Sequence, residues 1–144
     1  MARTWGARER SVDVEPFDLD GAYITLTGDL DVRDEDLLRE VIGSAIAAGY
    51  HRLVIDFTRT TFFDAGAYRV LLDSLAPLLA VDDAKVVLGG AQGCVARLLE
   101  VVDADRAFLV YLDRDVARRA LRVTASRPAS RAVSVEAAPP ASRT

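Results

Sequence analysis

Short apolar runs alternate with helical stripes along most of the chain, and this alternation predicts an α/β domain. The first two runs, residues 12–17 and 22–27, are joined by Asp18-Leu-Asp-Gly21, in which Asp-Gly is a favoured hairpin turn. Later runs lack polar alternation, as expected of strands covered on both faces of a mostly parallel sheet. These runs are residues 53–56, 85–88 and 108–111.

Apolar residues recur at helical spacing in four stretches, and each stripe predicts one buried helix face. The expected helices cover residues 34–48, 67–79, 94–102 and 115–121. Pro77 lacks a backbone donor, which predicts a kink or an early end in the second helix. The residues expected to point inward from that helix are Leu71, Leu72, Leu75, Leu78 and Leu79. We therefore expect a mostly parallel sheet of four to five strands with an N-terminal hairpin and about four helices.

The two ends of the chain differ in composition from its middle. Residues 124–144 hold three of the five prolines and no aromatic residue, which predicts a disordered tail. Residues 1–10 are expected to form a flexible extension, although Trp5 is a residue able to pack on the core. With 144 residues in total, the chain has room for one ordinary domain, which we expect over residues 11–123.

Charge and hydropathy narrow the possible partners and compartments. The formal net charge of -4 gives a field that repels nucleic acid and anionic membranes. No stretch of about 18 consecutive apolar residues occurs, and no apolar segment of a secretory signal follows the first residues. We therefore expect a cytoplasmic protein that does not insert into a membrane and does not bind nucleic acid.

Few residues offer catalytic or metal-binding chemistry. His51 precedes an expected strand, and Cys94 opens an expected helix, far away in sequence. A single cysteine cannot form an internal disulfide, and no zinc-site spacing is present. Because catalysis needs positioned acids, bases or nucleophiles, we expect a protein that is not an enzyme and needs no cofactor or metal.

Two further features have alternative interpretations. Gly89-Gly-Ala-Gln-Gly93 lies between a strand and a helix, where free N–H groups suit an anion, but a tight turn is the favoured interpretation. Asp56 ends a buried strand, as the acceptor of a response-regulator receiver does. That fold needs a lysine ending its last strand, whereas the only lysine here, Lys85, begins a strand. The receiver interpretation is therefore set aside.

Three segments resemble the STAS domain family. Residues 56–72 run from a buried strand through Phe62-Phe-Asp-Ala-Gly-Ala67 into a helix, and the family has Phe-x-Asp-Ser followed by a small residue and Gly. Gly28-Asp-Leu-Asp31 is similar to the family's turn after its second strand, and Val95-Ala-Arg-Leu-Leu-Glu100 to its later helix. Together the resemblance covers about residues 12–122, and it implies an anti-sigma-factor antagonist.

The resemblance also implies a regulatory mechanism. In this family the serine after the motif Asp docks on an ATP-binding anti-sigma factor, which is a serine kinase, and can be phosphorylated by it. The added charge of about -1.5 to -2 then releases the partner. Here Ala65 occupies the serine position, and Ala67 occupies that of the following glycine. The usual phosphoacceptor is therefore absent, and the nearby hydroxyls of Thr58, Thr60, Thr61 and Ser74 lie at other positions.

The residues expected to bind the partner lie at the two motifs that precede helices. They are Asp29, Asp31, Asp64, Ala65, Gly66, Tyr68 and Arg69. Each has a structural alternative: Asp29 and Asp31 as turn formers, Asp64 as a helix cap, and Tyr68 as a core residue. The alternative function is a small-molecule or nucleotide-binding STAS module or an accessory domain of a transport system, for which the 89–93 loop is the best support.

Overall fold

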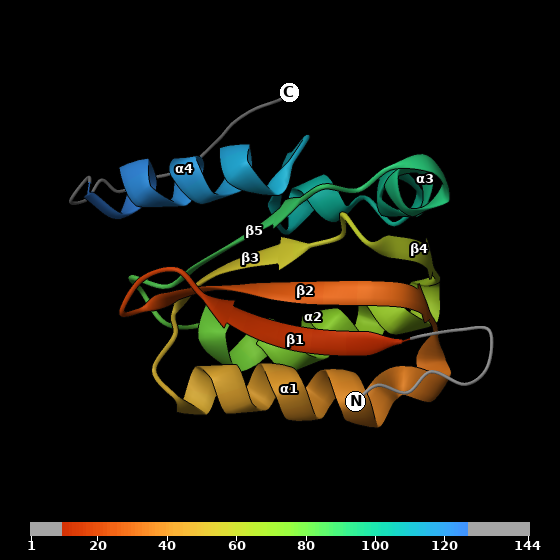
Figure 1. Cartoon of the computed structure of the whole chain (residues 1–144), viewed down its shortest axis with the longest axis horizontal. Helices are drawn as coiled ribbons and strands as arrows, with labels where there is room; N and C mark the ends of the chain where they lie inside the picture. The colour runs from red at the N-terminus through yellow and green to blue at the C-terminus, as the bar shows by residue number, and fades with distance from the viewer. Residues whose placement is uncertain (1–9, 127–144) are drawn as a thin grey trace.

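The computed structural model describes residues 10–126 as one sheet with helices on both of its faces (Figure 1). The strands are β1 Ser11–Pro16, β2 Gly21–Leu30, β3 Arg52–Asp56, β4 Thr60–Phe63, β5 Lys85–Gly89 and β6 Leu109–Tyr111. The helices are α1 Glu35–Ala47, α2 Ala65–Leu79, α3 Gly93–Val101 and α4 Arg114–Ser126. Two 3-10 turns, η1 Val32–Asp34 and η2 Ala104–Arg106, complete the fold.

The sheet has the order β1-β2-β3-β5-β6, in which β1 is antiparallel to β2 and every other pairing is parallel. This confirms the expected α/β class, the N-terminal hairpin and the mostly parallel sheet. The short strand β4 pairs with the end of β2 and was not expected. It follows a shift in the register of β2 at Gly28/Asp29, where Gly28 has a φ of +90°.

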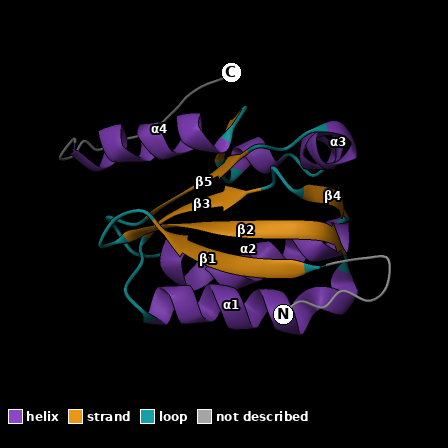
Figure 2. Cartoon of the chain, viewed as in Figure 1, coloured by secondary structure: helices purple, strands orange, loops and turns teal. Residues whose placement is uncertain are grey.

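Both faces of the central strands are buried, which explains why their sequences lack polar alternation. Leu53 and Ile55 point to the large core beneath α1 and α2, whereas Val54 between them points to a smaller core beneath α4. Figure 2 shows α1 and α2 on one side of the sheet and α4 on the other. Successive side chains of β3 thus point to opposite faces of the sheet, and on each face they contact apolar residues.

Helix α2 corrects one prediction about the core. Leu71, Leu75 and Leu78 are buried as expected, but Leu79 is 42% exposed, so its expected inward position was wrong. Leu79 lies at the edge of the apolar stripe in the last turn of α2, and the helix ends there, two residues after Pro77. The helix thus continues past Pro77 to the end expected from its apolar spacing, and the early end that Pro77 predicts does not occur.

The expected boundaries at the ends of the chain lie mostly outside residues 10–126. Helix α4 continues to Ser126 and so includes the first three residues of the expected tail. The expected N-terminal extension, apart from Arg10, and the remainder of the tail are not among the described residues. No helix within residues 10–126 is long and apolar enough to cross a membrane.

Candidate functional site

The expected partner-binding residues lie where β2 ends in η1 and where β4 leads into α2. The parallel strands all end at this edge of the sheet, which is where such folds usually meet ligands and partners. We call residues 29–33 together with residues 64–69 the η1–α2 surface. The structure brings its two segments into direct contact, as the following geometry shows.

The first segment begins in the parallel pairing of β2 with β4. Asp29 is the register partner of Phe62, and Leu30 is the partner of Phe63. The Thr61 hydroxyl donates a hydrogen bond to Asp29 Oδ1. Asp29 therefore ties the end of β2 to β4, and it lies in the strand itself, before the turn that was considered for it.

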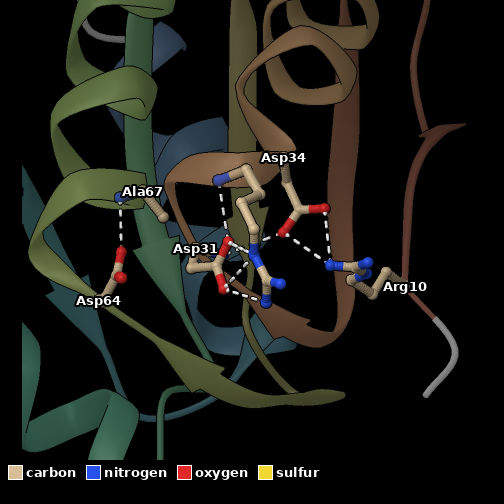
Figure 3. Close-up of polar contacts among 6 residues, drawn as sticks. Arg10, Asp31, Asp34, Asp64 and Ala67 are labelled. Carbon is tan, nitrogen blue, oxygen red and sulfur yellow. Dashed lines mark hydrogen bonds and ion pairs between the residues drawn. The ribbon is translucent and has the colours of Figure 1, made fainter. Parts of the chain in front are cut away.

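Asp31 and Asp34 organise the η1 turn (Figure 3). The backbone N–H of Arg33 donates to Asp31 Oδ1 at 2.8 Å, and the Arg33 guanidinium contacts both carboxylate oxygens at 2.8–3.2 Å. In return, the Asp31 N–H donates to Asp34 Oδ2 at 3.0 Å. Arg10 Nη1 lies 3.2 Å from Asp34 Oδ1, so the start of β1 is joined to the same turn. The turn is held by reciprocal capping and two ion pairs.

The Arg33 contacts lower the pKa of the Asp31 carboxyl from 3.8 to about 2, first through the guanidinium hydrogen bonds and then through the backbone N–H. Because the folded-state pKa is the lower one, the pairing stabilises the fold above pH 3.8 and is lost as the pH falls through about 2. We expect the NMR titration midpoint of the Asp31 carboxyl near pH 2, and a higher midpoint in Arg33→Gln. A midpoint in the wild type equal to that in Arg33→Gln would contradict the pairing.

Asp64 caps α2, the helix that carries the second segment. Its side-chain Oδ1 accepts a hydrogen bond from the Ala67 N–H at 2.8 Å, and its backbone is extended (Figure 3). A cap of this kind contributes about 1 kcal/mol to helix stability. The capping alternative for Asp64 is therefore realised. Ala65, the first residue of α2, is exposed directly beside it.

Gly66 joins the two segments of the η1–α2 surface. A Cβ placed on Gly66 would lie 3.0 Å from Val32 Cβ, which is closer than ordinary van der Waals contact. A glycine here lets α2 and η1 approach each other. Val32 nevertheless remains 53% exposed, so it is an apolar side chain on the surface beside Gly66.

The two remaining predicted residues take different positions. Tyr68 is only 5% exposed and packs in the large core. It is therefore a core residue, which was the alternative considered for it, and it is not available as a surface contact. Burial, followed by the nearby Asp105 carboxylate, raises the pKa of its phenol. Arg69, the next residue, is exposed and remains on the η1–α2 surface.

Two exposed apolar side chains lie near this site but are not among the residues predicted to bind the partner. Val32 follows the Asp31 turn, and Phe62 precedes the buried Phe63 in β4 with 42% of its surface exposed. The sequence carries only a weak signal for Phe62, because β4 does not alternate: Thr61 and Phe62 at its centre are both exposed.

Asp56 and the 89–93 loop form a separate structural cluster at the same edge of the sheet. Asp56 is fully buried and accepts hydrogen bonds from the Thr58 N–H at 3.0 Å and from Arg114 Nη1 at 2.9 Å. Gly90 has a φ of +84° and packs directly against Thr58. The loop thus makes a close turn over the Asp56 cluster, in agreement with the favoured interpretation of its glycines.

His51 and Cys94 do not form a joint site. His51 Nδ1 lies 4.0 Å from Asp20 Oδ2 beside the β1–β2 hairpin, before the start of β3. Cys94 lies in α3 after the end of β5, and its thiol donates to the Thr61 carbonyl at 3.3 Å. Because β3 and β5 are parallel, the start of β3 and the end of β5 lie at opposite ends of the strands. Within residues 10–126, no three His, Cys, Asp or Glu side chains are grouped as metal ligands would be.

Solved structures share this fold. An anti-sigma factor antagonist from Mycobacterium paratuberculosis is 21% identical with a TM-score of 0.71, covering 79% of this chain and 95% of its own. The unphosphorylated anti-sigma factor antagonist SpoIIAA is 20% identical with a TM-score of 0.67, covering 78% and 97%. An anti-sigma-factor antagonist (STAS) domain protein from Planctomyces limnophilus is 15% identical with a TM-score of 0.58, covering 81% and 99%.

The sequence itself matches a family model. A comparison with curated protein sequences gives no significant match. The model of the family described as Mlab, STAS domain, matches residues 15–112, which is more than half of the chain. This match spans the Gly28–Asp31 turn, the Asp64 motif and the later helix from which the resemblance was first drawn. The chain therefore belongs to the STAS domain family.

Proposed function

We propose that the protein is an anti-sigma-factor antagonist that binds an ATP-binding, serine-kinase-like anti-sigma factor through the η1–α2 surface and acts by binding alone. The observation that carries the proposal is the exposed start of α2, capped by Asp64 and packed against Val32 of η1. Ala65 and Arg69 are exposed on this surface, whereas Tyr68 is buried beneath it. The similarity to anti-sigma factor antagonists supports the same role.

Ala65 gives the proposed antagonist a distinctive property. It is the exposed first residue of α2, at the position where the family motif has serine, and its methyl group cannot accept phosphate. Nearby hydroxyls are engaged in the fold: Thr58 donates to Asp56, Thr60 to the Leu26 carbonyl, and Ser74 to the Val70 carbonyl. Phosphorylation at this position, the step that normally releases the kinase, would therefore not occur, and the kinase would remain bound.

Binding of the kinase is expected to depend on Ala65. A glutamate there lies next to the N-terminus of α2, so it preserves helix stability while adding charge and bulk to the docking surface. We expect Ala65→Glu to weaken binding at least about tenfold, equivalent to about 1.4 kcal/mol, in isothermal titration against purified anti-sigma kinases. Ala76→Glu, at an exposed alanine farther along the same helix, should bind like the wild type.

Intact-mass analysis with ATP provides the second readout. The wild type is expected to gain no phosphate in the complex, whereas Ala65→Ser is expected to gain one. Equal binding by Ala65→Glu and Ala76→Glu would contradict docking at this surface. Failure of every anti-sigma kinase to bind the wild type would contradict the proposed function itself.

The second candidate is a module that binds small molecules or nucleotides, or an accessory domain of a transport system. The alanine at position 65 fits a module that is not switched by phosphorylation. A rise in melting temperature on adding a nucleotide, without binding of any kinase, would favour this candidate.

A further inference from the structure

Strand β6 forms one edge of the sheet, and it is the less protected of the two edges. Within residues 10–126, no strand pairs with its outer side. The opposite edge strand, β1, carries Asp13, Glu15 and Pro16, which are residue types that discourage pairing with another chain. By contrast, β6 and the residue after it read Leu109-Val-Tyr-Leu112, with neither a charge nor a proline. The β6 edge is therefore open to a further strand.

Apolar side chains of this edge are exposed on both faces of the sheet. Leu109 is 46% exposed, Val110 is 42% exposed, and Leu112, just past the strand, is 84% exposed. Leu109 is the register partner of Val87, which faces the smaller core beneath α4. Val110 is the partner of Leu88, which faces the large core. Each face of the sheet thus ends in an apolar side chain that solvent reaches.

The backbone of Val110 directs its polar groups to the open side. The Tyr111 carbonyl accepts a hydrogen bond from the Gly90 N–H at 3.4 Å, so Tyr111 faces β5. Because successive residues of a strand alternate in this direction, the N–H and C=O of Val110 point away from β5. Two copies of β6 placed antiparallel, with Val110 opposite Val110, would exchange two hydrogen bonds. This pairing has two-fold symmetry, so the same surface serves in both copies.

Charged residues at the two ends of β6 indicate a second copy of the chain as the partner. Arg106 before the strand and Asp115 after it are exposed, and neither forms an ion pair within the described part of the chain. Antiparallel pairing brings Arg106 of each copy beside Asp115 of the other, whereas parallel pairing would bring like charges together. Arg114 lies opposite Arg106 in this register, but its guanidinium is directed to the buried Asp56. Asp105 lies near the core tyrosine of α2.

We propose that two copies of the chain associate through antiparallel pairing of β6, with Val110 opposite Val110 and Arg106 of each copy beside Asp115 of the other. The pairing continues the sheet from one chain into the next and covers the exposed Leu109 and Leu112 side chains. It does not depend on what the η1–α2 surface binds, because β3 and β5 separate β2 from β6.

Sedimentation velocity of the full-length chain measures this association, with circular dichroism to show that each variant is folded. The wild type is expected to form a dimer whose proportion increases with concentration. Val110→Pro removes the outward N–H and keeps the groups that face β5, so it should weaken dimerisation at least about tenfold. Leu112→Asp should do the same by placing a charge on the apolar edge. Leu19→Asp is the matched control, because Leu19 is 97% exposed at the β1–β2 turn, and it should dimerise like the wild type.

A charge exchange between chains tests the partner and the register. Arg106→Asp and Asp115→Lys are each expected to weaken the dimer about tenfold, because each creates two contacts between like charges. An equimolar mixture of the two variants should dimerise like the wild type, because opposite charges then meet in both contacts.

Three results would overturn the proposal, and none of them involves the kinase. The first is a wild type that is monomeric at every concentration, including one that dimerises only after removal of residues 127–144, since the tail would then occupy the edge. The second is a dimer that Val110→Pro and Leu112→Asp leave intact, which would place the interface elsewhere. The third is a mixture of Arg106→Asp and Asp115→Lys that dimerises no better than either variant alone.

Discussion

Arg114→Met is expected to lower the free energy of unfolding by about 3 kcal/mol, because it leaves a buried carboxylate without its counter-charge. Asp56 is fully buried, and Arg114 Nη1 lies 2.9 Å from its Oδ2. The guanidinium also contacts Glu15 at 3.1 Å and lies 3.6 Å from the centre of the Tyr23 ring. One side chain at the start of α4 therefore joins the end of β3 to β1 and β2.

Urea unfolding monitored by circular dichroism measures this loss. The matched control is Arg39→Met, which breaks an ion pair of similar length, 2.8 Å to Glu35, between side chains that are more than 40% exposed. This control is expected to cost less than about 1 kcal/mol. Asp56→Asn in the Arg114→Met background should recover part of the loss, because no buried charge then remains unpaired. Equal losses in Arg114→Met and Arg39→Met would contradict a special role for the buried pair.

Gly90→Ala is expected to cost about 3 kcal/mol, from left-handed backbone strain and from overpacking together. Gly90 has a φ of +84°, and an added Cβ would collide with the Thr58 hydroxyl and lie 2.9 Å from the Thr58 backbone nitrogen. Thr58 cannot move away freely, because both its N–H and its hydroxyl bind Asp56. The substitution therefore disturbs the hydrogen bonds of a buried carboxylate.

Gly93→Ala separates the two contributions to this cost. Gly93 also has a positive φ, +57°, but apart from its two chain neighbours and the backbone of its own helix no atom lies within 4 Å of the position of an added Cβ. Gly93→Ala should therefore show only the backbone strain, about 1 kcal/mol, in the same urea unfolding experiment. A loss as large as that of Gly90→Ala would show that contact with Thr58 contributes little.

The fold was predictable because its central strands are buried on both faces. The apolar run at Leu53, Val54 and Ile55 identifies such a strand before any pairing is known. Strand β4 escaped prediction because it has only four residues, with two exposed ones, Thr61 and Phe62, at its centre. Its position depends on tertiary contacts, including the bond from the Thr60 hydroxyl to the Leu26 carbonyl.

The sequence indicated which motif positions make up the candidate site, but it indicated less clearly which of those side chains are exposed. Tyr68 has the helical spacing of Leu71 and Leu75, so the phase of α2 already indicated a core position. The Arg10–Asp34 ion pair has no local signal, because the two residues lie 24 positions apart and meet only when β1 pairs with β2.

The strand order has a consequence for the synthesis of the protein. Along β1-β2-β3-β5-β6, each strand lies beside the one that precedes it in this series, and the first and last strands form the two edges. No strand has to insert between two that are already paired. As the chain leaves the ribosome, each new strand of this series can add to a growing edge, so the sheet can assemble in the order of translation.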